Sequence, residues 1–122
     1  MPPSTKPNKR QLGTKYEKMA AAYLKKPELG YKLLEANYRC FFGEIDLIAK
    51  DKDTVVFCEV KYRQNGRQGN PLEAVNYRKQ QIIYKCAMNY MTFIYKKEAP
   101  CRFDVIGFQG DQICHIKNAF QG

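Results

Sequence analysis

The sequence lacks the features of membrane-spanning, secreted and zinc-binding proteins. No apolar run approaches the roughly 20 residues that a membrane-spanning helix needs, and Met1–Leu12 holds charges and prolines without the apolar core of a signal peptide. The five cysteines are an odd set with no C-x-x-C pair, so no tetrahedral zinc site is indicated. We therefore expect a cytoplasmic protein with no membrane partner, whose thiols are reduced and mostly buried.

Acidic residues are scarce relative to basic ones. The 122 residues include 21 Lys and Arg against 12 Asp and Glu, which gives a formal charge of +9. A basic surface attracts polyanions and binds phosphate backbones in a salt-dependent way. Nucleic acid is therefore the expected partner, although a chain that is merely basic and soluble has the same composition.

The apolar fraction of 44% is sufficient for a buried core of one domain. The sequence pattern predicts a flexible basic arm over residues 1–13 and a single domain over residues 14–122. Helical periodicity predicts a first helix over 14–26, begun by a capping box of Thr14 and Glu17. Pro27 and Gly30 would end this helix.

Alternating and β-branched segments predict five strands, over residues 31–39, 44–50, 54–63, 102–109 and 112–119. A second helix is predicted from Asn70, as N-cap before Pro71, to about Tyr95. The resulting order is α-β-β-β-α-β-β. It predicts an α/β fold with a mixed central β-sheet flanked by helices.

Three charged residues converge if the second and third predicted strands pair. Side chains alternate along a strand, so Asp46 lies on one face and Ile45 and Leu47 lie on the other. Pairing through a short turn then lets Asp46 and Glu59 project from the same face. Lys61 follows two residues along, roughly 7 Å from Glu59.

Two carboxylates and an amine suit metal-assisted cleavage of phosphodiester bonds. Carboxylates hold Mg²⁺, the metal polarises the phosphate and acidifies a bound water, and an ammonium stabilises negative charge. A solvated polar face of an antiparallel sheet would give the same charges. The apolar run Val55–Cys58 argues against that alternative, since it indicates a central strand covered on both faces.

Five motifs occur in a linked order: Gly43–Ala49, Val56–Arg63, Pro71–Val75 with Lys79, Arg102–Ile106 and His115–Phe120. In these motifs, from about Thr14 to Phe120, the sequence resembles the bacterial YraN family. That family lies in the PD-(D/E)XK, restriction-endonuclease-like superfamily and is similar to archaeal Holliday junction resolvases. The resemblance implies a restriction-endonuclease-like fold and a Mg²⁺-dependent endonuclease, with Mn²⁺ as a substitute. It also implies a substrate of branched or otherwise structured DNA.

The same resemblance implies roles for individual residues. Asp46 and Glu59 would be Mg²⁺ ligands, with the Val60 carbonyl as a third, and Lys61 would position water and stabilise charge. Glu17 matches an acidic residue that resolvase-like proteins place near the metal, although the predicted capping box explains the same carboxylate. Ile45 stands where the superfamily motif has proline, which leaves the metal ligand itself in place.

Basic and aromatic residues near the predicted site are candidates for nucleic-acid contacts. The expected phosphate contacts are Arg39, Arg63, Arg67 and Lys79. Splayed bases could stack on aromatic side chains near the site, unless these are core or rim residues: Tyr38, Phe41, Phe42 and Tyr62. His115 is assigned no catalytic role. A homodimer is expected by analogy with resolvases, which act on two-fold symmetric substrates.

Two other classes of function fit the sequence. One is a non-catalytic nucleic-acid-binding protein with a vestigial nuclease site, for which binding without cleavage would be the signature. The other is a protein-interaction module whose basic face meets an acidic protein partner.

Overall fold

A computed structural model describes residues 9–63 and 75–121, without the side chains of residues 9–12 and 63. The elements follow the order α1 (Lys9–Leu24), β1 (Lys32–Cys40), β2 (Gly43–Asp51), β3 (Thr54–Arg63), α2 (Tyr77–Tyr90), η3 (Met91–Tyr95), β4 (Cys101–Gln109) and β5 (Gln112–Phe120). The fold is α/β with a mixed sheet, as the sequence predicts. No helix in these two segments combines the length and the apolar character needed to cross a bilayer.

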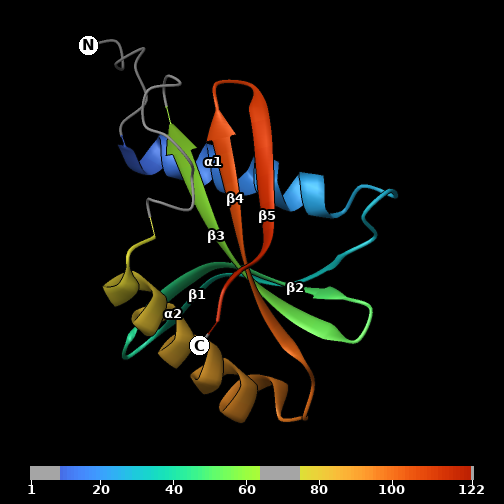
Figure 1. The fold of residues 1–122 in the computed structure, drawn as a ribbon, viewed down its shortest axis with the longest axis vertical. Helices are drawn as coiled ribbons and strands as arrows, with labels where there is room; N and C mark the ends of the chain where they lie inside the picture. Colours follow the sequence, from blue (N-terminus) through green and yellow to red (C-terminus); the bar gives the residue numbers. More distant parts are fainter. Residues whose placement is uncertain (1–8, 64–74, 122) are drawn as a thin grey trace, which may run out of the picture.

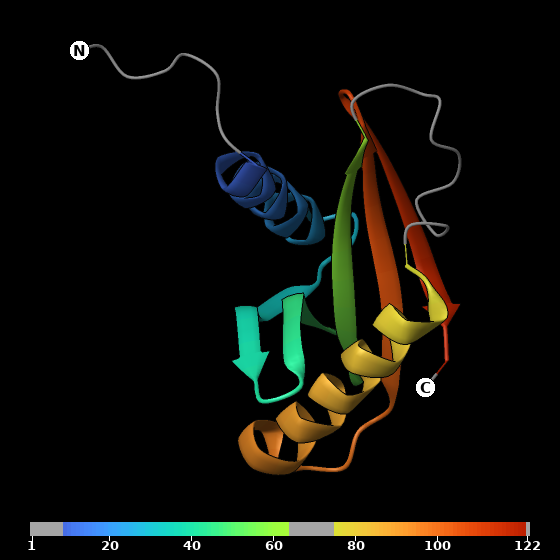
Figure 2. The same ribbon diagram turned by 90° about the vertical axis from the view of Figure 1, so that its left-hand side faces the viewer.

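The five strands form one sheet in the order in which they occur along the chain. Strands β1, β2 and β3 are joined by short turns and pair antiparallel, while β3 and β4 pair in parallel. Parallel neighbours need a crossover connection, and α2 belongs to the segment that joins β3 to β4. Helices α1 and α2 cover opposite faces of the sheet (Figure 1, Figure 2).

Helix α1 begins at Lys9, five residues before the predicted start at residue 14. No proline lies between Pro7 and Pro27, so the helix continues through Gly13 into the segment predicted to be an arm. The predicted capping box is therefore wrong, because Thr14 and Glu17 lie inside the helix. Residues 1–8 of the predicted arm lie outside the described residues.

Helix α2 begins later than predicted. Its N-cap is Asn76, whose side chain accepts a 2.9 Å hydrogen bond from the backbone of Lys79, and not Asn70. Residues 70–73, including Asn70 and Pro71, lie outside the described residues. The helix then widens into the π-helical turn η3, which Lys96 ends in a left-handed conformation at φ 62°. The predicted end near Tyr95 is confirmed.

Two apolar layers form the core, one on each face of the sheet. The layer under α2 includes Phe57, Ile83 and Val105, and the layer under α1 includes Leu24, Val56 and Ile106. Ile45 packs in the layer under α2 together with Ile48, while Leu47 packs under α1. The prediction that Ile45 and Leu47 share a face is therefore wrong.

The cysteines are free, as predicted, but most of them are not buried. Cys58 and Cys86 are buried, Cys40 is partly exposed, and Cys101 and Cys114 are exposed. The exposed thiols lie at the start of β4 and on the edge strand β5, where the sheet is not fully covered. The expectation of mostly buried thiols is wrong for this reason.

Candidate active site where β2 separates from β3

Asp46 lies at the point where the ladder between β2 and β3 ends. The last paired residues are Leu47 and Cys58. Beyond them, the Asp46 carboxylate accepts a 2.8 Å hydrogen bond from the backbone N–H of Val60. A side-chain oxygen thus replaces the backbone acceptor that a continued ladder would supply. The break in alternation at Ile45 and Asp46 follows from this separation of the two strands.

Glu59 is a buried carboxylate beside Asp46. The residue is 4% exposed, and its Oε2 atom has no hydrogen-bond partner among the described residues. Burial, and then the negative charge of Asp46, raise the pKa of Glu59 to about 9. A buried polar atom without a partner is costly, so this carboxylate is poorly satisfied by the protein alone.

Two lysines partly offset the charge of Glu59. Lys61 Nζ lies 3.8 Å from Glu59 Oε1, and Lys79 Nζ lies 3.9 Å from the same oxygen. Lys61 comes from β3 itself, two residues along the same face, whereas Lys79 comes from the first turn of α2. The predicted grouping of Asp46, Glu59 and Lys61 is thus present in the structure. Lys79, predicted only as a phosphate contact, joins it.

Glu17 reaches this site from α1. Burial, and then the charge of Asp46, raise the pKa of Glu17 to about 7. Asn37 of β1 faces this carboxylate: turned with its nitrogen toward Glu17, its amide donates to both oxygens at 3.2 and 3.3 Å. Because Thr14 and Glu17 lie inside α1, the capping explanation for Glu17 no longer applies. Nothing in the sequence pattern pointed to Asn37.

The donor atoms at this site fit a small divalent cation that keeps part of its water shell. Asp46 and Glu59 supply carboxylate oxygens. The Val60 carbonyl faces the same side as the Val60 N–H that binds Asp46, because both groups of a strand residue point to the same neighbour. Among residues 9–63 and 75–121, no group of three or more His, Cys, Asp or Glu side chains is arranged to hold a metal ion. Mg²⁺ commonly binds through one or two carboxylates, with waters and substrate phosphates completing its shell.

The other expected phosphate contacts are less well placed or lie outside the described residues. Arg39 is exposed at the end of β1 and pairs with Glu44 at 3.2 Å. Arg63 ends β3, and its side chain is not described; Arg67 lies outside the described residues. Of the four, the structure therefore brings Lys79 to the acidic residues and leaves Arg39 on the neighbouring surface.

The four aromatic candidates divide into two pairs. Tyr38 is buried and donates a hydrogen bond to Asn89, and Tyr62 stacks on Tyr16 with ring centroids 4.2 Å apart. These two rings are structural. Phe41 and Phe42 lie in the turn between β1 and β2 and are exposed.

A second polar cluster lies on the α1 side of the sheet, and it was not predicted from the sequence. Asp104 of β4 is fully buried and accepts hydrogen bonds from Arg102, from His115 Nε2 at 2.7 Å and from the backbone of Asn118 at 3.0 Å. Tyr23 lies 3.1 Å from the other ring nitrogen of His115. The signal that could have revealed this cluster is a carboxylate inside an apolar strand.

Comparison with known proteins gives one consistent result. The model of the family described as "Uncharacterised protein family UPF0102" matches residues 16–108. A UPF0102 protein from Thermodesulfovibrio yellowstonii is 49% identical over 110 residues, which cover 90% of this chain and 96% of the relative. UPF0102 proteins from Lachnoclostridium phytofermentans and Geobacter metallireducens are each 45% identical, over 93% and 92% of this chain and 95% and 93% of their own lengths. The chain therefore belongs to the UPF0102 family, the YraN family that its motifs resemble.

Proposed function

We propose that this protein is a divalent-metal-dependent endonuclease that hydrolyses phosphodiester bonds of DNA. The observation that carries the proposal is the Glu59 carboxylate, buried beside Asp46 with one oxygen that no described residue satisfies. Two adjacent carboxylates repel each other unless a proton or a cation lies between them. A bound Mg²⁺ or Mn²⁺ would remove that repulsion and supply the missing partner.

Asp46 and Glu59 would hold the metal ion, with the Val60 carbonyl on the same side. When bound, the ion polarises the phosphate and lowers the pKa of a coordinated water. The Val60 N–H orients Asp46 by a hydrogen bond to one of its oxygens, so the carboxylate is positioned by the backbone before any ligand binds. Glu17 lies beside Asp46, and Asn37 in turn donates to the Glu17 carboxylate.

Lys61 and Lys79 provide the positive charge that phosphate chemistry requires. Both ammonium groups lie within 4 Å of Glu59 Oε1 and remain partly exposed, with 27% and 35% of their side-chain surface accessible. They can therefore turn from Glu59 to an incoming phosphate without losing contact with solvent. Preorganised cations of this kind stabilise charge that develops on phosphate oxygens in the transition state.

The substrate class follows from charge and from the family resemblance. The chain carries a formal charge of +9, and Lys61 and Lys79 place two cations at the carboxylates. A basic surface around a metal-binding carboxylate pair favours a polyanionic substrate. The resemblance to resolvases favours branched or structured DNA within that class.

Cleavage of labelled four-way junction, flap, single-stranded and duplex DNA in the presence of Mg²⁺ or Mn²⁺ tests this proposal. Asp46→Asn and Glu59→Gln are expected to reduce cleavage to background, and Lys61→Ala to reduce the rate by roughly 100-fold. Asp53→Asn is the matched control, because Asp53 is an exposed acid in the β2–β3 turn. Binding of DNA by the unmodified protein without cleavage of any substrate would favour the non-catalytic nucleic-acid-binding alternative.

A further inference from the structure

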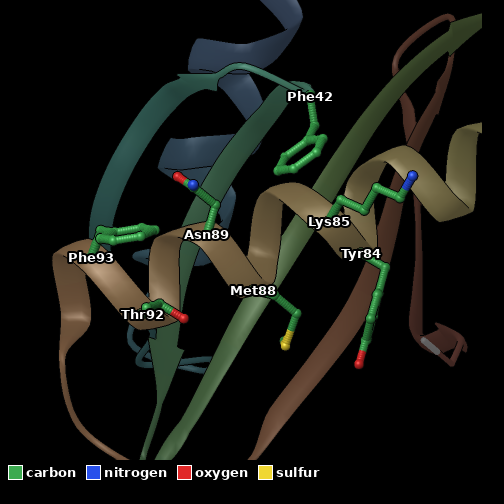
Figure 3. Close-up of a pocket in the computed structure, with 7 residues that line it drawn as sticks. All are labelled: Phe42, Tyr84, Lys85, Met88, Asn89, Thr92 and Phe93. Atoms are coloured by element: carbon green, nitrogen blue, oxygen red, sulfur yellow. The ribbon is translucent and has the colours of Figure 1, made fainter.

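A shallow apolar cleft lies on the outer face of α2, beside the turn between β1 and β2. Its volume is about 380 Å³. Figure 3 shows Phe42 leaning over the helix from this turn, with Phe93 at the far end of the cleft. The lining residues are Phe42, Tyr84, Lys85, Met88, Asn89, Thr92 and Phe93.

The rings at this surface are unusually exposed for phenylalanine. Phe41 is 98% exposed, Phe93 62% and Phe42 45%. Phe41 and Phe42 stand nearly perpendicular, with ring centroids 5.7 Å apart and an interplanar angle of 83°. Grouped exposed apolar side chains of this kind mark an interaction site more often than single ones do.

The turn that carries these rings is held firmly against α2. A Cβ atom at Gly43 would lie 2.7 Å from the Ile82 side chain and 3.8 Å from Cys86 Sγ. Only glycine therefore allows this close approach, and Gly43 also has a φ of 154° that other residues rarely adopt. The rings are thus presented by a packed turn, so little conformational entropy is lost when a ligand binds them.

The charges around the cleft are suited to an anionic strand. Lys85 Nζ lies 5.8 Å from the centroid of the Phe42 ring, and the lining contains no acidic residue. The carboxamide oxygen of Asn89 accepts a hydrogen bond from Tyr38. The surface therefore combines exposed aromatic rings with a cation.

We propose that this surface, defined by Phe41, Phe42, Lys85, Met88 and Phe93, binds unpaired nucleobases of a nucleic-acid strand that continues to the acidic site. That the strand continues from this surface to the acidic site rests on the proposed function. Open aromatic rings beside cations are how proteins bind single-stranded nucleic acid, because every base has a face that can stack. A fully paired duplex does not present its base faces. The preferred substrate is therefore DNA with an unpaired segment next to the cleaved bond.

The spacing between the two sites agrees with this substrate. Phe42 and Asp46 are four residues apart in chain order, so they are separated by about 13 Å in an extended strand. This is the axial length of about four stacked nucleotides. On α2, Lys79 and Lys85 are separated by six residues, or about 9 Å along the helix. Lys79 faces Glu59 and Lys85 faces Phe42, so one cation lies at each end of this span.

Binding measured in EDTA tests this inference separately from catalysis. Fluorescence anisotropy would compare a labelled single-stranded oligonucleotide with its duplex for the unmodified protein, Phe41→Leu and Phe42→Leu. Loss of a stacking ring is expected to weaken single-strand binding about tenfold and to leave duplex binding unchanged. Phe41→Tyr keeps an aromatic ring and should bind the single strand as tightly as the unmodified protein does. Tyr77→Leu is the matched control, since Tyr77 is an exposed aromatic residue on α2 outside the cleft.

Several results would overturn the inference. Single-strand binding that is unchanged in Phe41→Leu and Phe42→Leu would do so, as would an equal loss for single strand and duplex. Sedimentation showing that these substitutions only convert a dimer to a monomer would assign the surface to self-association instead. Selective loss of single-strand binding in a protein that cleaves nothing would retain this inference and reject the proposed function. Metal-dependent cleavage by the unmodified protein, with unchanged single-strand binding in both variants, would reject this inference and retain the proposed function.

Discussion

Glu59 and Asp104 are both buried carboxylates, and they lie on adjacent parallel strands on opposite faces of the sheet. Glu59 is 4% exposed and Asp104 is fully buried. Asp104 is surrounded by donors, whereas Glu59 faces a second carboxylate and has an oxygen without a partner among the described residues. The two side chains are therefore buried to nearly the same extent, but hydrogen-bond donors surround one and a second carboxylate faces the other.

The pKa values reflect this difference. Burial by itself would raise the pKa of Asp104, but hydrogen bonds from His115 and Arg102 outweigh it and hold the pKa below its usual value. At Glu59, burial and the charge of Asp46 act in the same direction and raise the pKa to about 9. A buried carboxylate is therefore structural when donors satisfy it and a candidate for ligand binding when they do not.

The largest effect is expected from breaking the satisfied carboxylate. Asp104→Asn should lower the free energy of unfolding by about 3–5 kcal/mol, because it leaves the buried His115 side chain without its carboxylate partner and the partly buried Arg102 with Asp51 alone. Urea denaturation followed by circular dichroism measures this. Asp111→Asn, an exposed acid in the β4–β5 turn, should stay within about 0.5 kcal/mol. An unchanged urea midpoint for Asp104→Asn would remove the distinction between the two carboxylates.

The pH dependence of stability should have opposite signs at the two positions. The pKa of Asp104 is lowered in the folded state, so its stabilisation is present above the unfolded pKa of about 3.9 and is lost as the pH falls through the folded value. The pKa of Glu59 is raised from 4.5 to about 9, so its ionisation destabilises the fold increasingly as the pH rises between those values.

Urea midpoints measured across the pH range separate these contributions. In Asp104→Asn, the free energy of unfolding should fall less than in the parent as the pH drops below about 4. In Glu59→Gln, it should fall less than in the parent as the pH rises toward about 9. The parent protein in the absence of divalent metal is the reference for both curves. Identical pH profiles for the parent and Glu59→Gln would show that neither burial nor Asp46 raises the pKa of Glu59.

Divalent metal should stabilise the protein through the unsatisfied carboxylate alone. A free metal concentration ten times the dissociation constant is expected to add about 1.4 kcal/mol to the free energy of unfolding. Urea denaturation of the parent with Mn²⁺ or Mg²⁺, against EDTA, measures this gain. The gain should disappear in Glu59→Gln and Asp46→Asn and persist in Asp53→Asn. A gain that survives in Glu59→Gln would place the metal elsewhere.

The smallest effect on stability is expected at the surface pair of Arg39 and Glu44. These side chains are 71% and 46% exposed, and exposed pairs contribute about 0–1 kcal/mol. Arg39→Ala should therefore change the unfolding free energy by less than about 0.5 kcal/mol. If Arg39 contacts phosphate, the same substitution should reduce the slope of log affinity for DNA against log salt by about one. An unchanged slope would confine phosphate binding to the lysines.

Local signals in the sequence predicted much of the fold. The β3 bounds match the prediction, and the other strands agree within one residue at each end, because β-branched runs and charged turns specify strands directly. The start of α1 was missed because a plausible capping box lay inside a longer helix. The start of α2 was missed because Asn76 caps the helix without a following proline.

The candidate site was predicted in part. Asp46, Glu59 and Lys61 lie together as predicted, although Asp46 meets Glu59 where the alternation of β2 breaks and its carboxylate accepts from Val60. Lys79 and Asn37 were not placed at the acidic residues, because they come from elements whose positions depend on packing. The cluster around Asp104 was also missed, since it joins Asp104 to Tyr31 and Asp51 through Arg102.

The sequence by itself determined the helices and strands, the basic charge, and the juxtaposition of Asp46, Glu59 and Lys61, since all of these depend on composition or on neighbours close in the chain. The tertiary structure decided the rest. Packing of α1 brought Glu17 to Asp46, the crossover brought Lys79 to Glu59, and the β1–β2 turn was fixed against α2 through Gly43. These contacts join residues that are distant in sequence, so no local periodicity encodes them. Only packing of the two layers against one sheet brings them together.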